Sequence, residues 1–158
     1  MCIRDRLKGE NVFQGYWKMK EKTEEAFKED GFFITGDLAQ KDENGYFTIV
    51  GRDKDMIISG GLNVYPKEIE DVLNELPNVL ESAVFGLQHS DFGEAVVAAV
   101  VVNDDKNDEN QIIEFTKDKI AKYKQPKKII FMDNLPRNSM GKVQKNLLRK
   151  NNQNLFKG

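Results

Sequence analysis

Lys142 is the residue of this chain whose type and setting point most directly to chemistry. It follows Gly141 at the end of a predicted loop that begins at Pro136. A positioned ammonium group can stabilise negative charge where two anions are joined, such as a carboxylate and a phosphate. The alternative is a solvated surface lysine near the start of a helix. The other motifs of the chain decide between these two interpretations.

Asp37 is a second candidate. It follows Thr35 and Gly36 at the end of a predicted strand. A carboxylate in such a place can accept two hydrogen bonds from the vicinal hydroxyls of a ribose. The alternative is an aspartate in a turn, because three-residue motifs recur by chance. The family resemblance described below, which includes Gly51-Arg52, decides between these two interpretations.

The stretch 51–70 organises the chain. Charged residues lead into a short apolar strand, then into Gly60-Gly61 and a helix that starts at Pro66. Paired glycines allow positive φ or the close approach of a ligand. Proline suits a first helical position. Read locally, this is a strand-turn-helix in a small α/β unit.

Composition sets limits on the class of protein. The chain has 158 residues, of which 39% are hydrophobic and 32% charged, which suits one or two small units with a core. Its longest apolar run, 95–102, is too short to span a bilayer, and no signal peptide is visible. With one cysteine, Cys2, an internal disulfide is excluded, and we expect a cytoplasmic protein.

The net charge is −2, but lysine and arginine far outnumber acidic residues between Lys117 and Lys150. This region could face an anionic partner or form a solvated lysine-rich surface. A nucleic-acid site would need aromatics repeated among the lysines, and only Tyr123 qualifies, so no nucleic-acid partner is expected. His89 is the only histidine, and no metal site is predicted.

The hydrophobic pattern predicts an α+β fold, in which a three-stranded sheet with helices follows a β-rich first third. Asn44-Gly45 predicts a two-residue hairpin between 38–41 and 46–50. The second strand of the sheet is almost wholly apolar, so both its faces should be covered. The expected helices are 21–28, 66–76, one capped by Asp108 and running to about Tyr123, and 145–151; the expected sheet strands are 80–87, 95–102 and 128–132, with a polar turn at 103–107.

Taken together, the segments 35–37, 51–70 and 135–146 resemble the signature motifs of adenylate-forming (AMP-binding) enzymes, which include the acyl-CoA synthetases. The resemblance runs from about Leu7 to about Lys150. It corresponds to the carboxyl-terminal part of such an enzyme, without most of its large N-terminal domain. It implies a non-family leader at 1–6, the β-rich end of the N-terminal AMP-binding domain at 7–53, a mobile C-terminal domain at 54–150 and a tail at 151–158.

The resemblance assigns roles in adenylation. Asp37 corresponds to the family residue that holds the ribose hydroxyls of ATP and of the acyl-adenylate, and Arg52 to a second ribose and phosphate contact. Lys142 corresponds to the lysine that bridges the carboxylate and the α-phosphate. Lys54 corresponds to the hinge about which the small domain swings between two orientations.

It also assigns contacts to coenzyme A. Gly60 and Gly61 correspond to the turn that lines the pantetheine tunnel. Phe92 and Tyr123 occupy positions where the family often has aromatics near the nucleotide of CoA, and Lys127 could pair with a CoA phosphate. Gln125 departs from the arginine of some relatives. For the two aromatic residues, a place in the core is the alternative.

Within the family, the segments 63–70, 91–94 and 135–146 are most similar to malonyl-CoA synthetases. The resemblance implies an acid–thiol ligase of fatty acid metabolism that uses ATP, CoA and Mg²⁺ to activate a carboxylate, malonate in this case, with the Mg²⁺ site in the missing domain. The 158-residue chain alone should then be inactive or nearly so. The alternative is a stand-alone module that binds CoA, a nucleotide or a partner protein without turnover.

Overall fold

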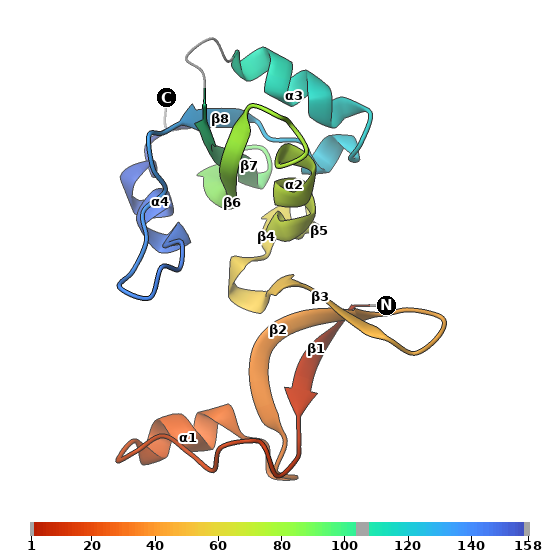
Figure 1. The fold of residues 1–158 in the computed structure, drawn as a ribbon, viewed down its shortest axis with the longest axis vertical. Coiled ribbons are helices and arrows are strands. Elements are labelled where there is room, and N and C mark those ends of the chain that lie inside the picture. The colour runs from red at the N-terminus through yellow and green to blue at the C-terminus, as the bar shows by residue number, and fades with distance from the viewer. Residues whose placement is uncertain (1, 104–107, 157–158) are drawn as a thin grey trace. The chain divides into compact units, whose positions relative to one another are not determined.

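The computed structural model describes residues 2–103 and 108–156, which form two compact units, Met1–Lys54 and Asp55–Gly158 (Figure 1). Met1, at the start of the predicted leader, lies outside the described residues. So do 104–107 of the predicted polar turn and the last two residues of the predicted tail.

The first unit is a three-stranded antiparallel sheet in the order β1-β2-β3. The hairpin predicted at Asn44-Gly45 is confirmed, but its loop is longer than two residues. Asp42 closes it, because its carboxylate accepts the Tyr46 N–H at 2.8 Å and its own N–H donates to the Tyr46 carbonyl at 3.0 Å. The elements are β1 (Cys2–Leu7), α1 (Lys20–Ala26), β2 (Phe33–Lys41), β3 (Phe47–Arg52) and a 3₁₀ turn, η1 (Asp53–Asp55).

The second unit contains a five-stranded sheet, so the prediction of three strands is wrong, although the α+β class is confirmed. One additional strand, β4 (Ile57–Ser59), is the short apolar strand expected before Gly60-Gly61, but it was not counted as part of the sheet. The other, β5 (Leu62–Val64), has three residues, too few to show an alternating pattern in the sequence. The other strands are β6 (Val79–His89), β7 (Gly93–Val102) and β8 (Lys128–Phe131). The order is β5-β4-β7-β6, and β8 pairs parallel with β7.

Three predicted helices end earlier than expected, the first of them α1, which ends at Ala26 and not at Lys28. Helix α2 ends at Leu73, and the predicted end, Leu76, precedes Pro77, a position that disfavours the helical conformation. The helix capped by Asp108 ends at Lys117, and Ile120, in the turn that follows, is buried in the core. The helices are α2 (Pro66–Leu73), α3 (Glu109–Lys117), the 3₁₀ turn η2 (Lys122–Lys124) and α4 (Lys145–Asn151).

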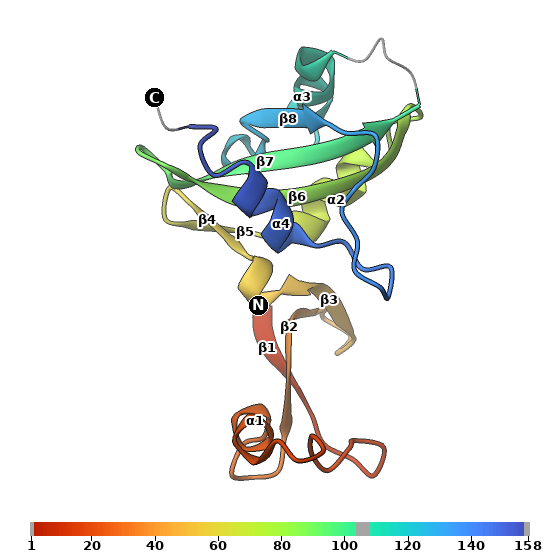
Figure 2. The same ribbon diagram turned by 90° about the vertical axis from the view of Figure 1, so that its left-hand side faces the viewer.

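Strand β7 is covered on both faces, as its sequence predicts. Val96, Ala98 and Val100 pack in one cluster with residues of α2 and α3, and Val97 and Ala99 pack in another with Leu148 of α4. Helix α4 therefore lies on the opposite face of the sheet from α2 and α3 (Figure 2). None of the helices in the described part of the chain is both long and apolar enough to cross a membrane.

Candidate functional site

Asp37 and Arg52 lie directly opposite each other on β2 and β3. The Arg52 Nε donates to Asp37 Oδ1 at 2.7 Å. The Asp37 N–H donates to the Thr35 hydroxyl at 3.0 Å, and that hydroxyl donates to the Asp5 carbonyl at 3.1 Å. The side chains of Asp37 and Arg52 are 25% and 51% exposed.

This arrangement leaves a fixed carboxylate and a guanidinium side by side at the surface of the first unit. The second oxygen of Asp37 can accept further hydrogen bonds, and Arg52 has donors left for an anion. The pair therefore fits a ligand that carries both hydroxyls and a phosphate, as a nucleotide does.

Lys54 is exposed in η1, and the boundary between the two compact units falls directly after it. Asp53, before it, pairs with Arg4 of the first unit at 3.3 Å, and Asp55, after it, pairs with Arg149 of the second unit at 3.3 Å. Each neighbour is thus held within its own unit. Among the described residues, Lys54 itself makes no ion pair.

Gly60 and Gly61 form the two-residue turn between β4 and β5, with φ of 59° and 78°. Both are in the left-handed region, which residues with a Cβ rarely adopt. A Cβ built on either glycine would meet no described atom within 4 Å. The turn therefore needs glycine for its backbone conformation, and the space around it is open.

Phe92 and Lys127 come together beside this turn. The Gly60 N–H donates to the Phe92 carbonyl at 2.8 Å, and the Lys127 ammonium lies 5.3 Å from the centre of the Phe92 ring. The His89 ring packs on Phe92 with centroids 4.8 Å apart. The exposed ring of Phe92 excludes the alternative of a core aromatic. An aromatic face beside an ammonium can receive an adenine ring and a phosphate.

Tyr123 belongs to a different set of contacts, on η2. The Lys124 ammonium lies 5.7 Å from its ring centre and pairs with Glu68 of α2 at 2.6 Å. Burial of this ammonium lowers its pKa, but the hydrogen bond and charge of Glu68, together with Tyr123, outweigh that effect and raise the pKa above 10.5. Tyr123 is also exposed, so it is not a core residue either.

Lys142 is presented by a tight loop between Pro136 and Gln144. Asn138 orders this loop, because its Oδ1 accepts the N–H groups of Met140 and Lys142 at 3.0 and 2.9 Å. The sequence alone did not identify Asn138 as a functional residue. The Asn138 N–H donates to the Lys142 carbonyl at 2.9 Å. The propensity of asparagine to form such turns was the signal that could have found it.

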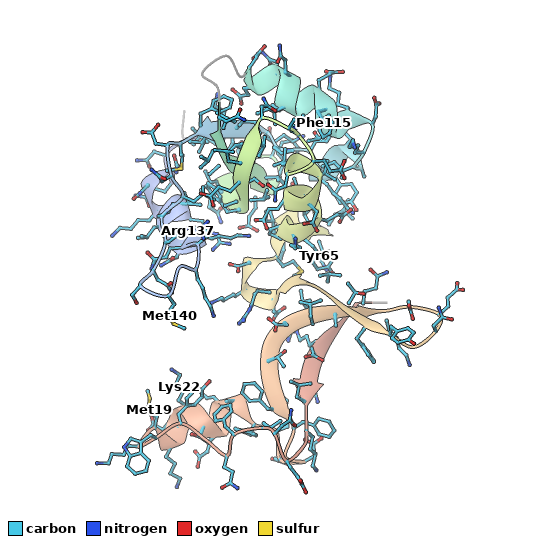
Figure 3. The ribbon with its side chains drawn as sticks, in the orientation of Figure 1. Met19, Lys22, Tyr65, Phe115, Arg137 and Met140 are labelled. Carbon is cyan, nitrogen blue, oxygen red and sulfur yellow. The ribbon has the colours of Figure 1, made fainter. Side chains whose placement is uncertain are left out.

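Arg137 braces the same loop. Its Nη1 donates to the Gly141 carbonyl at 2.7 Å, and its other amino group pairs with Glu81 of β6. Figure 3 shows Arg137 and Met140 on this loop. Among the described residues, the exposed Lys142 ammonium makes no ion pair, whereas Lys145 and Arg149 both do. Lys142 therefore combines a fixed backbone with a free cation.

Comparisons with known proteins show which family this chain is similar to. Residues 68–142 match the AMP-binding enzyme C-terminal domain. The chain is 46% identical over 143 residues to the long-chain-fatty-acid–CoA ligase FadD13 of Mycobacterium tuberculosis, which covers 90% of this chain. It is 39% identical over 160 residues to the malonate–CoA ligase of Arabidopsis thaliana, which covers 94% of it.

Among solved structures, ATP-bound MatB from Rhodopseudomonas palustris is 54% identical, with a TM-score of 0.87. The match covers 96% of this chain and 30% of that one. The chain likewise spans 28% of the length of FadD13 and 26% of the malonate–CoA ligase.

Proposed function

Because this chain belongs to the AMP-binding enzymes and carries their C-terminal domain, we propose that it serves an ATP-dependent carboxylate–CoA ligase. In the first half-reaction a carboxylate oxygen attacks the α-phosphorus of ATP, and pyrophosphate leaves. In the second, the thiol of CoA attacks the acyl carbon of the adenylate, and AMP leaves. The chain supplies groups for both steps.

The observation that carries this proposal is the ammonium of Lys142, which makes no ion pair within the described part of the chain and stands on a loop held by Asn138 and Arg137. Negative charge increases between the carboxylate and the α-phosphate as the new bond forms. A cation whose loop is already ordered stabilises that charge without a cost in reorganisation. Asp37 and Arg52 would hold the ribose and a phosphate of the same nucleotide.

The second half-reaction would use the open turn at Gly60-Gly61. A thin pantetheine arm can pass a turn that carries no side chains. Phe92 and Lys127, beside it, would receive the nucleotide end of CoA, with Tyr123 as a further stacking surface. Mg²⁺ would accompany ATP and bind within the part of the ligase that this chain does not match.

Malonate is the proposed acid. The supports are the likeness of segments 63–70, 91–94 and 135–146 to malonyl-CoA synthetases and the similarity to a plant malonate–CoA ligase. The test is to express the genomic reading frame around this chain and compare thioester formation from malonate, acetate and a long-chain fatty acid. Preference for malonate by at least tenfold is expected, and preference for either other acid would refute this assignment.

The role of Lys142 is tested in a graft that replaces the matching segment of Rhodopseudomonas palustris MatB, which is 54% identical, with this chain. Lys142→Gln removes the charge and should lower ATP–pyrophosphate exchange by about 10²–10³-fold. The matched control, Lys150→Gln, changes an exposed lysine of α4 and should stay within about twofold of the unsubstituted graft. Equal exchange in the two variants would contradict the proposal.

A second candidate function rests on the exposed Phe92–Lys127 pair: the chain could bind CoA without turnover. Calorimetric titration of the 158-residue chain with CoA, with Phe92→Ala as the comparison, measures that binding.

We expect no ATP–pyrophosphate exchange by the chain alone. Measurable exchange would overturn the expectation that adenylation needs the rest of a ligase.

A further inference from the structure

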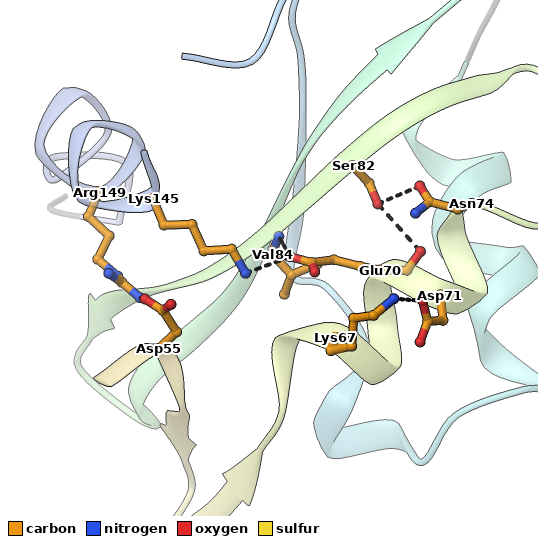
Figure 4. Close-up of polar contacts among 9 residues, drawn as sticks. All are labelled: Asp55, Lys67, Glu70, Asp71, Asn74, Ser82, Val84, Lys145 and Arg149. Carbon is orange, nitrogen blue, oxygen red and sulfur yellow. Dashed lines mark hydrogen bonds and ion pairs between the residues drawn. The ribbon is translucent and has the colours of Figure 1, made fainter. Parts of the chain in front are cut away.

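Glu70 joins elements from both faces of the sheet at the free edge of β6. Its Oε1 accepts the Val84 N–H of β6 at 2.8 Å and pairs with the Lys145 ammonium of α4 at 2.6 Å (Figure 4). Glu70 lies on α2, which covers one face, whereas α4 covers the other. The side chains of Glu70 and Lys145 are only 14% and 18% exposed.

Helix α4 is held at a second point one turn later. Arg149 pairs with Asp55 at 3.3 Å, and Asp55 is the first residue of the second unit. Between the two cations, Leu148 is buried among the residues of β6 and β7. The two ion pairs and this apolar contact fix both the rotation and the position of α4.

The loop that presents Lys142 leads directly into the N-terminal end of α4, where Lys145 pairs with Glu70. The Gln144 N–H donates to the Pro136 carbonyl at 2.8 Å, and the backbones of Arg137 and Val143 form an isolated antiparallel β-bridge. These contacts close the base of the loop at residues 143–144. Lys145 follows at once. A helix of only seven residues is not stable by itself, so tertiary contacts must hold it in place.

We propose that Glu70 and Lys145, with Asp55 and Arg149, are positioning residues that set the place of Lys142 relative to the hinge. The inference rests on the proposed function, because the position of Lys142 affects activity only if Lys142 takes part in adenylation. A rotation at Lys54 is transmitted through Asp55 and Arg149 to α4, and from the start of α4 to the loop. Lys142 then moves with the whole second unit.

The first test needs no activity and uses the 158-residue chain. Lys145→Met keeps the aliphatic stem and removes the charge. We expect the backbone N–H groups of Asn138, Lys142 and Gln144 to exchange with deuterium at least tenfold faster. The matched control is Lys67→Met, because Lys67 pairs with Asp71 on exposed α2 positions with side chains 55% and 56% exposed. In Lys67→Met, the same three backbone N–H groups should exchange at rates within twofold of those in the unsubstituted chain.

The second test measures adenylation in the MatB graft. Lys145→Met should lower kcat for ATP–pyrophosphate exchange about tenfold and leave KM for ATP within twofold, because the nucleotide contacts are elsewhere. Lys145→Arg, which keeps the charge, should restore most of the rate. If Lys145→Met does not fold, Arg149→Met provides an independent variant, and it should also lower kcat for ATP–pyrophosphate exchange.

The outcomes separate the two proposals. If Lys142→Gln leaves exchange unchanged, the proposed function fails, whatever Lys145 does. If Lys142→Gln abolishes exchange while Lys145→Met and Arg149→Met preserve both kcat and the protection of the loop amides, the positioning role is refuted and the proposed function stands.

Discussion

Gly61 has a φ of 78° and open space where a Cβ would point, so a substitution there has two separable effects. Gly61→Val should lower the free energy of unfolding of the chain by about 1–2 kcal/mol, because a β-branched residue is strained at positive φ. In the MatB graft it should reduce thioester formation at least tenfold and leave adenylation within threefold.

Gly45→Val is the matched control, since Gly45 lies in another hairpin with a φ of 91°. It should be destabilising but should leave both half-reactions unchanged. If Gly61→Val lowered both half-reactions equally, the proposed contact with the pantetheine arm would be wrong.

The Lys124–Glu68 pair predicts a pH dependence. Since the pKa of Lys124 is raised above 10.5, its stabilising contribution is present below that pH and is lost as the pH rises through the raised value. Glu68→Gln should therefore lower the free energy of unfolding by about 0.5–1 kcal/mol at neutral pH. The difference from the unsubstituted chain should shrink towards zero once the pH exceeds the raised pKa of Lys124, as chemical denaturation at neutral and at strongly alkaline pH would show. A difference that grows with pH would contradict the assignment.

The loop of residues 136–144 is the element on which the proposed chemistry depends most. Asn138→Ala removes the acceptor for two backbone N–H groups and should lower adenylation in the graft about tenfold. Asn138→Asp keeps an acceptor and should retain most of the rate. Asn134→Ala changes an exposed asparagine just before the loop and is the control. Equal rates for Asn138→Ala and Asn134→Ala would show that the loop is ordered by other contacts.

Local signals in the sequence predicted helix α4 and the short strands β4 and β8, but they did not predict strand β5 or that β4 and β5 join the sheet. Helix α4 has the bounds 145–151 that the sequence predicts. Strands β4 and β5 are stabilised by the turn between them and by the contact of Ser59 with Gly93 of β7, a pairing that no local pattern encodes. The strand count therefore depended on the tertiary structure.

For the whole molecule, the prediction concerns Lys54. Lys54→Pro fixes φ near −65°, a value that a 3₁₀ turn allows, and so removes the freedom that a hinge needs. In the graft, one half-reaction should fall at least tenfold while the other stays within threefold, as separate assays of pyrophosphate exchange and thioester formation would reveal. Lys54→Ala should leave both nearly unchanged. Equal loss of both steps in Lys54→Pro would argue against a hinge at this residue.

The sequence alone determined the candidate residues, because their chemistry and spacing are written in short segments: Asp37 after Thr35-Gly36, the glycine pair, and Lys142 after Gly141. Tertiary structure decided which charges are free and which are paired. Lys145 and Arg149 reach partners 75 and 94 positions away, and such contacts exist only once the sheet has brought α2, α4 and Asp55 together. A lysine in the sequence carries no sign of whether a carboxylate will neutralise it, so only the fold could show that Lys142 makes no ion pair with any residue that the structure describes.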